Sequence, residues 1–352
     1  MPRTTGIRLR AETAPNERRT PLVPSDAADL VAGGLPVTVE DSPRRAFPVE
    51  EFQRVGCAVA PAHSWPDAGP DEVVLGLKEP AGPPDELTHR HVFFGHAYAG
   101  QRGGPALLRR FAAGGGTLLD LEYLTDDAGH RVTAFGRFAG YVGAALAVLH
   151  QRRRLAAPLA ATTRPELDEL LREHAGGARA LVIGALGRSG GGAREALAVA
   201  GVPTTGWDLP ETAALDRAAL RAHDLLVNAV APAAPGPPFL TADDLPRPDR
   251  ALTVVADVTC DVTSARNRLP VNDRVTGWDR PARRLHSAPP LDVIAIDNLP
   301  SLLPRESSAA FSAGLLPHLR ALPGGSPVWD RSARAFRTAL TTTDDPRART
   351  DG

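Results

Sequence analysis

The strand-like segment 180–183 and the turn that follows it constrain the fold of this chain more than any other feature. The apolar run is typical of a buried strand, and it leads directly into a turn containing Gly184, Gly187 and Gly190, after which a helix-like segment begins. Glycines at such a turn let the backbone approach a pyrophosphate, whose charge the exposed N–H groups and the helix dipole hold. The pattern predicts a nucleotide-binding α/β domain, although the glycine spacing departs from G-x-G-x-x-G, and a turn that binds nothing is the alternative.

Asp208 adds to the case for a dinucleotide. It ends the next strand-like run, residues 204–207, and lies 21 positions after Gly187. An acid about 20 residues beyond the turn is placed to bind the ribose 2′-hydroxyl and to repel a 2′-phosphate. The sequence therefore predicts NAD, rather than NADP, as the cofactor.

Short apolar runs alternate with helix-like segments along the whole chain, which predicts β-α-β units and parallel sheets. The first expected elements are a strand at 7–9, a helix at 25–32, a strand at 37–39 and a helix at 50–55. Strands expected at 225–228, 252–257 and 293–296 complete a second sheet. A chain of 352 residues is long enough for two such domains.

Three strand-like runs in the first half each lead into an ionisable residue. Residues 73–77 precede Lys78, residues 92–95 precede His96, and residues 117–121 precede Glu122. Because ligands of open α/β sheets bind outside the carboxyl ends of the strands, we expect these three side chains to face one cleft. Taken singly, each has an ordinary alternative: a structural histidine, a helix cap or a solvated charge.

Lys78 is the only lysine among the forty Lys and Arg side chains of the chain. Arginine replaces lysine wherever only a solvated positive charge is needed, but a guanidinium stays protonated, whereas an ammonium can lose its proton near neutral pH. Retention of this one lysine predicts a proton-transfer role for it. Chance survival is the alternative.

Composition and charge exclude several classes of protein. The net charge of −1 and the absence of a basic stripe argue against a nucleic-acid partner. The longest apolar run, residues 138–149, is shorter than the ~18 residues of a membrane span, so we expect a buried helix and no membrane partner. Glu12 and Glu17 lie where a secretory signal avoids acids, which predicts a cytoplasmic protein. Cys57 and Cys260 lack metal-ligand spacing, and no metal site is expected.

Several segments, in order, make the chain resemble the NAD-dependent, lysine-forming saccharopine dehydrogenases, relatives of alanine dehydrogenase. They are LRAET (9–13), EDSP (40–43), GLKE (76–79), GHAY (95–98), DLE (120–122), AFG (134–136), IGALGRSG (183–190) and DNLPSLLPRE (297–306). The resemblance implies an α/β fold of two Rossmann-like domains with parallel sheets and an active-site cleft between them. It also implies oxidation of a CH–NH bond of saccharopine, giving L-lysine and 2-oxoglutarate, or the reverse condensation, by a monomer.

Carried over by position, the resemblance implies catalytic roles for four residues. Lys78 is similar to the family's base for the amine, and His96 to the acid/base that moves protons during imine hydrolysis. Glu79 and Glu122 resemble the carboxylates that tune them. Forming and hydrolysing a carbinolamine needs groups that exchange protons near neutral pH, which agrees with these roles.

The resemblance also implies binding residues. Arg19 is similar to a clamp for a substrate carboxylate, which a planar guanidinium suits. Arg131 and Phe135 lie in the stretch that lines the cofactor and substrate cleft, and Asp297 is expected to face the site. The candidate NAD-binding residues are Gly184, Gly187, Arg188, Ser189, Gly190 and Asp208.

The chain departs from the family at positions that bear on the substrate. Family lysines are replaced by Ala14 and Ala99, with Arg18 and Arg102 nearby, and a histidine is replaced by Asn298. Two alternatives to saccharopine dehydrogenase therefore stay open. One is an opine-type enzyme that joins a different amine and oxo acid in specialised metabolism; the other is a non-catalytic NAD-binding paralogue.

The expected domain boundaries follow the two sheets. Residues 1–135 with 315–352 are expected to form the substrate and catalytic domain, and residues 136–314 the NAD-binding domain.

Overall fold

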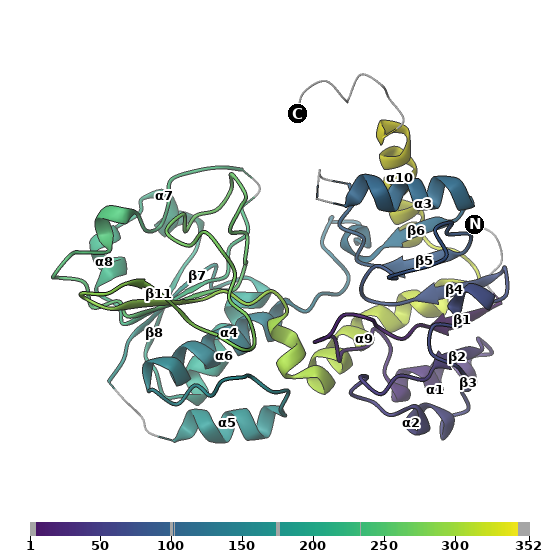
Figure 1. The fold of residues 1–352 in the computed structure, drawn as a ribbon, viewed down its shortest axis with the longest axis horizontal. Helices are drawn as coiled ribbons and strands as arrows, with labels where there is room; N and C mark the ends of the chain where they lie inside the picture. Colours follow the sequence, from purple (N-terminus) through teal and green to yellow (C-terminus); the bar gives the residue numbers. More distant parts are fainter. Residues whose placement is uncertain (1–4, 99–100, 102, 174–176, 233, 344–352) are drawn as a thin grey trace. The chain divides into compact units, whose positions relative to one another are not determined.

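The computed structural model describes residues 5–98, 101, 103–173, 177–232 and 234–343. The chain divides into two compact units (Figure 1). Unit 1 comprises Met1–Ala134 and Arg305–Gly352, and unit 2 comprises Phe135–Pro304. The chain thus returns to unit 1 between residues 304 and 305, whereas the sequence analysis places this boundary between 314 and 315. The assignment of substrate and cofactor to separate domains, and a cleft between them, stay predictions.

Unit 1 is built on a six-stranded sheet in the order β3-β2-β1-β4-β5-β6, in which every pairing is parallel. The strands are β1 (Gly6–Leu9), β2 (Val37–Glu40), β3 (Ala58–Ala60), β4 (Glu72–Leu75), β5 (Arg90–Phe93) and β6 (Thr117–Asp120). Parallel strands place their carboxyl ends at one edge, so the segments after β4, β5 and β6 are neighbours in space.

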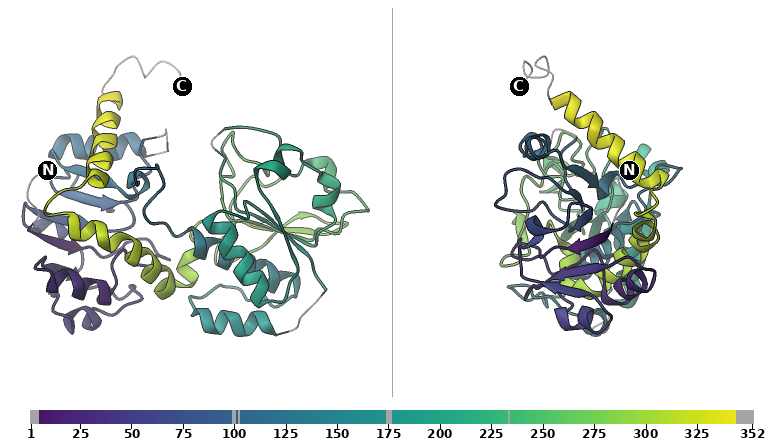
Figure 2. Two further views of the ribbon diagram at one scale, coloured as in Figure 1. Left: turned by 180° about the vertical axis from the view of Figure 1, so that it is seen from behind. Right: turned by 90° about the vertical axis from the view of Figure 1, so that its right-hand side faces the viewer.

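The helices of unit 1 come from both ends of the chain. They are α1 (Pro24–Ala32), α2 (Val49–Gln53), α3 (Gly104–Gly114), α9 (Pro304–Ala321) and α10 (Pro327–Thr343), with short 3-10 helices η1 (Trp65–Asp67) and η2 (Leu121–Tyr123). Viewed from behind, α9 and α10 pass over the strands of unit 1 (Figure 2). Phe111 of α3 and Phe336 of α10 pack in one core cluster with Phe93 of β5, which joins the C-terminal helix to the N-terminal sheet.

Unit 2 is built on a second six-stranded sheet, in the order β11-β12-β10-β9-β7-β8. Its strands are β7 (Ala180–Ile183), β8 (Thr204–Trp207), β9 (Leu225–Asn228), β10 (Val254–Asp257), β11 (Arg283–His286) and β12 (Leu291–Ile294). All pairings are parallel except that of β11 with β12, which is antiparallel. The α/β fold with two mostly parallel sheets that the sequence predicts is confirmed.

The helices of unit 2 cover this sheet. They are α4 (Gly136–Gln151), α5 (Arg164–Arg172), α6 (Arg188–Val199), α7 (Leu209–Ala213) and α8 (Arg217–Arg221), with η3 (Ala242–Asp244) and η4 (Leu299–Leu302). Helix α4 contains the long apolar run, and its residues from Tyr141 to Leu149 are buried against α6 and the strands. No helix in the described ranges is long and apolar enough to cross a membrane.

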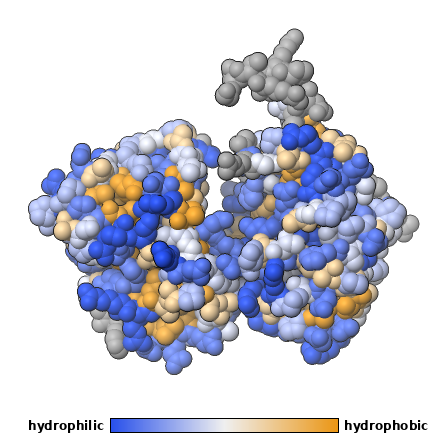
Figure 3. All heavy atoms as spheres, in the orientation of Figure 1, coloured by the Kyte–Doolittle hydropathy of each residue, from blue (hydrophilic) through white to orange (hydrophobic). Residues whose placement is uncertain are grey.

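The surface seen in Figure 3 is mostly hydrophilic, with hydrophobic patches interspersed on each unit. Leu186 and Leu209, each 84% exposed, stand out among the exposed hydrophobic side chains of the described residues. Both lie beside Asp208 in unit 2: Leu209 follows it in the chain, and the Leu186 N–H donates to its carboxylate at 3.0 Å. Exposed apolar groups beside a candidate ribose ligand suit the apolar face of a nucleobase.

Candidate active site

A pocket of about 590 Å³ lies at the carboxyl edge of the unit 1 sheet. Its lining comes from the loops after β1, β4 and β5 and from the start of α3, and consists of Thr13, Ala14, Lys78, Glu79, Ala81, Phe94, Gly95, His96, Gly103 and Gly104. Lys78 and His96 thus share one pocket, as their places after neighbouring strands predict. Glu122 is not among the lining residues.

His96 has an unusual backbone conformation. Its φ is 47°, in the left-handed region that residues other than glycine seldom adopt, and its side chain is exposed. The imidazole stacks on the Phe94 ring, with 6.2 Å between the ring centroids and an interplanar angle of 15°. The centroids of Phe94 and of Phe311 in α9 lie 5.9 Å apart. Strained residues of this kind cluster at functional sites, which supports His96 as a working residue.

Two expected carboxylates are held by arginines. Glu79 pairs with Arg110 of α3 at 2.9 Å, and Glu122 pairs with Arg131 at 3.0 Å. Arg131 and Glu122, assigned separately as binding and catalytic residues, therefore form one exposed ion pair in unit 1.

Asp120 is a buried acid that sequence reasoning missed. It is the last residue of β6, is 0% exposed, and accepts the Glu122 N–H at 2.9 Å. Burial raises its pKa to about 7; the backbone N–H groups of Glu122 and Gly95 oppose this rise, and the Glu122 charge adds to it. The DLE segment contains Asp120, but only the fold shows that this acid, rather than Glu122, is enclosed.

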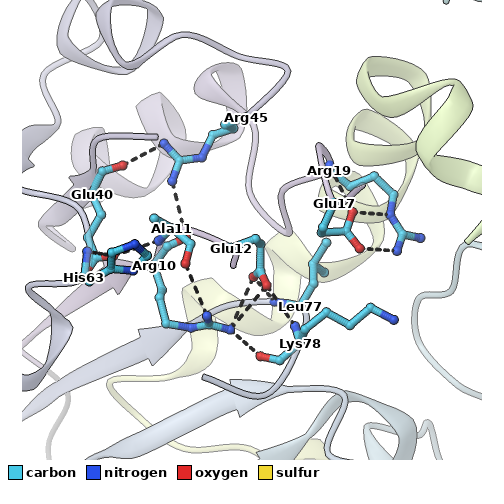
Figure 4. Close-up of polar contacts among 10 residues, drawn as sticks. All are labelled: Arg10, Ala11, Glu12, Glu17, Arg19, Glu40, Arg45, His63, Leu77 and Lys78. Carbon is cyan, nitrogen blue, oxygen red and sulfur yellow. Dashed lines mark hydrogen bonds and ion pairs between the residues drawn. The ribbon is translucent and has the colours of Figure 1, made fainter. Parts of the chain in front are cut away.

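Arg19 faces a carboxylate of its own chain (Figure 4). Its Nε and Nη2 donate to the two oxygens of buried Glu17 at 2.8 and 2.6 Å. Burial of Glu17 opposes ionisation, but hydrogen bonds from Arg19 and the charges of Arg19 and Lys78 outweigh it and lower the Glu17 pKa. Glu17 is thus a charged neighbour of Lys78 that the sequence analysis did not select; its position two residues before Arg19 was the available signal.

The substituted family positions are only partly visible. Ala14 lines the pocket. Ala99 and Arg102 lie outside the described residues.

In unit 2 the glycine turn has the features that a pyrophosphate needs. Gly184 has a φ of +82°, which favours glycine, and a Cβ at Gly190 would overlap the carbonyl oxygen of Gly184. Exposed Gly187 has no such obstruction and precedes Arg188, the first residue of α6, with half-buried Ser189 next. One glycine thus makes the turn, one allows close helix packing, and one leaves the backbone open to a ligand.

The remaining unit 2 candidates lie at the start of α4 and after β12. Half-buried Phe135 is the N-cap of α4, and exposed Asp297 follows β12 just before Asn298. Phe135 and Asp297 therefore belong to unit 2, whereas Arg19 and Arg131 belong to unit 1.

A buried polar pair at the carboxyl ends of β9 and β10 was also missed. Asn228 donates to Asp257 at 3.0 Å, and Thr259 donates to the same carboxylate oxygen at 2.8 Å. Burial, with the charges of Asp257 and Asp297, raises the pKa of the nearby Cys260 thiol. Within the described ranges, no group of three or more His, Cys, Asp or Glu side chains could hold a metal ion.

The family model for the alanine dehydrogenase/PNT N-terminal domain matches residues 8–142. The saccharopine dehydrogenase (NAD(+), L-lysine-forming) of Neurospora crassa is 42% identical over 96% of this chain and 97% of its own length. The enzyme of the same name from Schizosaccharomyces pombe is 40% identical over 94% and 97%. The chain belongs to the family of lysine-forming saccharopine dehydrogenases. The resemblance in the sequence motifs is thereby confirmed.

Solved structures support the fold alone. An L-alanine dehydrogenase matches with a TM-score of 0.67 at 17% identity, covering 94% of each chain. A transhydrogenase from Sinorhizobium meliloti matches with a TM-score of 0.67 at 15% identity, covering 93% of this chain and 97% of that one.

Proposed function

We propose that this protein is an NAD-dependent oxidoreductase that acts on the CH–NH bond of saccharopine. The reaction is saccharopine, NAD⁺ and water giving L-lysine, 2-oxoglutarate, NADH and a proton, or its reverse. The observation that carries the proposal is similarity to lysine-forming saccharopine dehydrogenases along nearly the whole chain. The pocket that joins the sole lysine to His96 supports it.

The glycine turn of unit 2 fits NAD. Gly187 and the first turn of α6, with Arg188 and Ser189, would hold the pyrophosphate, and Asp208 would hold the ribose. Leu186 and Leu209 would flank the adenine. When bound, NAD⁺ supplies the acceptor for the hydride that leaves the carbon beside the substrate nitrogen.

Lys78 and His96 of unit 1 carry out the proton transfers. Lys78 takes the proton of the secondary ammonium, since only a free amine can release a hydride and become an iminium ion. His96 takes a proton from the water that adds to the iminium carbon. His96 then gives that proton to the nitrogen of the carbinolamine, the C–N bond breaks, and His96 takes up the hydroxyl proton as the oxo acid forms.

The remaining residues are proposed to bind and tune. Glu79 and Glu122, each paired with an arginine, set the charge around Lys78 and His96. Arg19, oriented by Glu17, and Arg131 would bind substrate carboxylates. Phe135 and Asp297 are also proposed to contact the substrate.

We also propose a cytoplasmic monomer that serves lysine biosynthesis. A second candidate function is favoured by Ala14, which lines the pocket at a position where the sequence resemblance implies a family lysine. It is an opine-type enzyme with the same chemistry and a different amine or oxo acid.

The test is the initial rate of NADH oxidation by purified protein with lysine and 2-oxoglutarate, alongside pyruvate, glyoxylate and oxaloacetate. High kcat/KM confined to lysine with 2-oxoglutarate supports saccharopine dehydrogenase. Preference for another oxo acid supports the opine-type enzyme. NADH binding without turnover on any pair supports the non-catalytic paralogue.

A further inference from the structure

A buried ion pair lies directly against the backbone of Lys78 (Figure 4). Arg10 is 2% exposed and Glu12 is 8% exposed. The Glu12 carboxylate accepts the Leu77 N–H at 2.6 Å and the Lys78 N–H at 3.3 Å, while Arg10 Nη2 donates to the Lys78 carbonyl oxygen. Both backbone hydrogen-bonding groups of Lys78 are therefore bound by this pair, whose charged atoms lie 3.4 Å apart.

The segment before Lys78 is shaped around the same guanidinium. A Cβ at Gly76 would lie 2.5 Å from Arg10 Nη2 and 2.9 Å from its Nε, closer than real Cβ atoms come to other groups. Leu77 is 1% exposed and packs into the unit 1 core. Residues 76–78 therefore have little freedom to move without moving Arg10.

A second layer holds the ion pair itself. Arg45 Nη2 donates to the Arg10 carbonyl oxygen at 3.3 Å, and Glu40 accepts the Ala11 N–H at 2.8 Å. Burial lowers the pKa of Arg45 to about 10, against the opposing charges of Glu12, Glu40 and Asp41. Three of the family-like segments, at residues 9–13, 40–43 and 76–79, thus meet in one buried polar network behind Lys78.

Stability alone does not explain such a pair. Removing two charges from water costs several kcal/mol per ion, and apolar replacements of buried ion pairs are often neutral or stabilising. This pair fixes the orientation of Lys78, because it binds the backbone N–H and carbonyl groups of that residue. The Lys78 side chain runs toward Glu17 and Arg19 (Figure 4).

We propose that Arg10 and Glu12 are positioning residues, which fix the backbone of Lys78 so that its ε-amino group is held at the reacting amine. This rests on the proposed function, in which Lys78 accepts the proton of that amine. A misplacement of about 1 Å can cost roughly 100-fold in rate, so a rigid support for the base has a large effect on turnover.

The chain offers a matched control. Arg8 of β1 and Glu72 of β4 also pair at 3.4 Å, and Glu72 also accepts a backbone N–H, from Gly69 at 2.6 Å. This pair joins the same two strands at their other end, away from Lys78. Glu12→Gln and Glu72→Gln therefore remove the same charge from the same kind of contact.

Because Lys78 is the only lysine, protein labelled with ¹⁵N,¹³C-lysine gives one lysine amide signal and one ε-carbon signal. In unmodified protein we expect the Lys78 amide to exchange slowly, although it lies in a loop. In Glu12→Gln, whose NH₂ group cannot accept the Lys78 N–H, the amide exchanges at least about 10-fold faster and the ε-carbon signal shifts. We expect kcat to fall about 10- to 100-fold while the Kd for NADH is unchanged. Glu72→Gln leaves all four readouts as in the unmodified protein.

Three results overturn the proposal. The first is fast hydrogen exchange of the Lys78 amide in the unmodified protein. The second is a kcat of Glu12→Gln equal to that of the unmodified protein. The third is an equal loss of kcat in Glu12→Gln and Glu72→Gln. If Glu12→Gln does not fold, Gly76→Ala decides, since it displaces Arg10 while keeping both charges, and unmodified kcat there counts against the proposal. The NMR readouts need no substrate, so a failure of the proposed function appears separately, as absent turnover of saccharopine by protein with a well-ordered Lys78.

Discussion

At the scale of single residues, Lys78 matters for the kind of cation it is. A guanidinium at this position would keep the positive charge beside Glu17 but would not exchange a proton near neutral pH. We expect Lys78→Met and Lys78→Arg each to lower kcat by about 10²- to 10⁴-fold in NADH-linked assays. Binding of NADH, followed by its fluorescence, should not change, because the glycine turn belongs to unit 2.

The two variants separate charge from proton transfer. Substantial activity in Lys78→Arg, with none in Lys78→Met, would mean that Lys78 acts only as an electrostatic partner of Glu17 or of the substrate.

Asp120 gives a prediction about pH. Its pKa is raised from 3.8 to about 7 in the folded protein, chiefly by burial, so the folded state binds this proton more tightly than the unfolded state. Stability is therefore lost progressively as the pH rises from about 4 to about 7, and the loss is complete above that range. Asp120→Asn removes this loss, so at pH 8 it should unfold at a higher temperature than the unmodified protein. Between pH 5 and pH 8 the free energy of unfolding of the variant, relative to that of the unmodified protein, should rise by on the order of 2–3 kcal/mol.

Thermal unfolding at both pH values checks this, with exposed Asp85→Asn as the control. A difference between Asp120→Asn and the unmodified protein that is the same at pH 5 and pH 8 would contradict the assigned pKa.

The site residues that could be predicted are those marked by a local pattern in the sequence. Lys78 and His96 could be predicted because each follows an apolar run, and strand ends can be read along the chain. The partners of Glu79 and Glu122, and the burial of Glu17, Asp120 and Asp257, depend on which segments fold against them. Those pairings are tertiary, and apart from the position of Glu17 two residues before Arg19 the sequence alone has no signal for them.

At the scale of elements, the strand–turn–helix of β7 and α6 offers a pair of adjacent glycines with opposite surroundings. A Cβ at Gly190 would overlap the Gly184 carbonyl oxygen, whereas a Cβ at Gly191 would meet nothing within 4 Å. Gly190→Ala must push α6 away from the turn, and we expect the Kd for NADH to rise at least 10-fold, about 1.4 kcal/mol.

Gly191→Ala is the control. It should bind NADH normally and gain up to about 1 kcal/mol of stability, because alanine favours the helix. Fluorescence titration and thermal unfolding of both variants test this, and normal NADH affinity in Gly190→Ala would argue against pyrophosphate binding at this turn.

The two strands that sequence reasoning missed, β3 and β11, lie at the edges of their sheets. The central strands β1, β4, β7, β9 and β10 are mostly apolar and buried, so hydrophobic runs reveal them. Edge strands β3 and β11 lie largely outside the core, and the sequence RRLH of β11 has no strand-like alternation. Edge strands β6 and β8 were predicted. Strand ends also differ, since β4 stops at Leu75 and leaves Gly76 and Leu77 as the loop that carries Lys78.

At the scale of the whole molecule, unit 2 is one continuous stretch with its own sheet and core. Residues 135–304, expressed alone, should fold cooperatively and bind NADH, since they retain the glycine turn and Asp208. Residues 1–134 alone should not, because α10 covers part of their core through Phe336. Circular dichroism melting and NADH titration test both pieces, and a folded 1–134 piece would show that the C-terminal helices are dispensable.

The return of the chain to unit 1 could not be located from sequence because side-chain contacts decide it. The backbone N–H groups of Thr20 and Val23 donate to Ser308 and Ser312 of α9 at 2.9 and 3.1 Å. Arg305 pairs with Glu51 at 3.1 Å. These contacts place Arg305 and the residues that follow it in α9 in unit 1.

The insertion of unit 2 between the two parts of unit 1 sets an order of events on the ribosome. The first 134 residues emerge early but lack α9 and α10 until the last part of the chain is made. At ~5–20 residues per second, that delay is roughly 10–40 s, during which unit 2 can fold completely. We therefore expect the nascent chain to acquire its nucleotide-binding half first, while the half that carries Lys78 stays exposed to chaperones and proteases until α9 and α10 have been made.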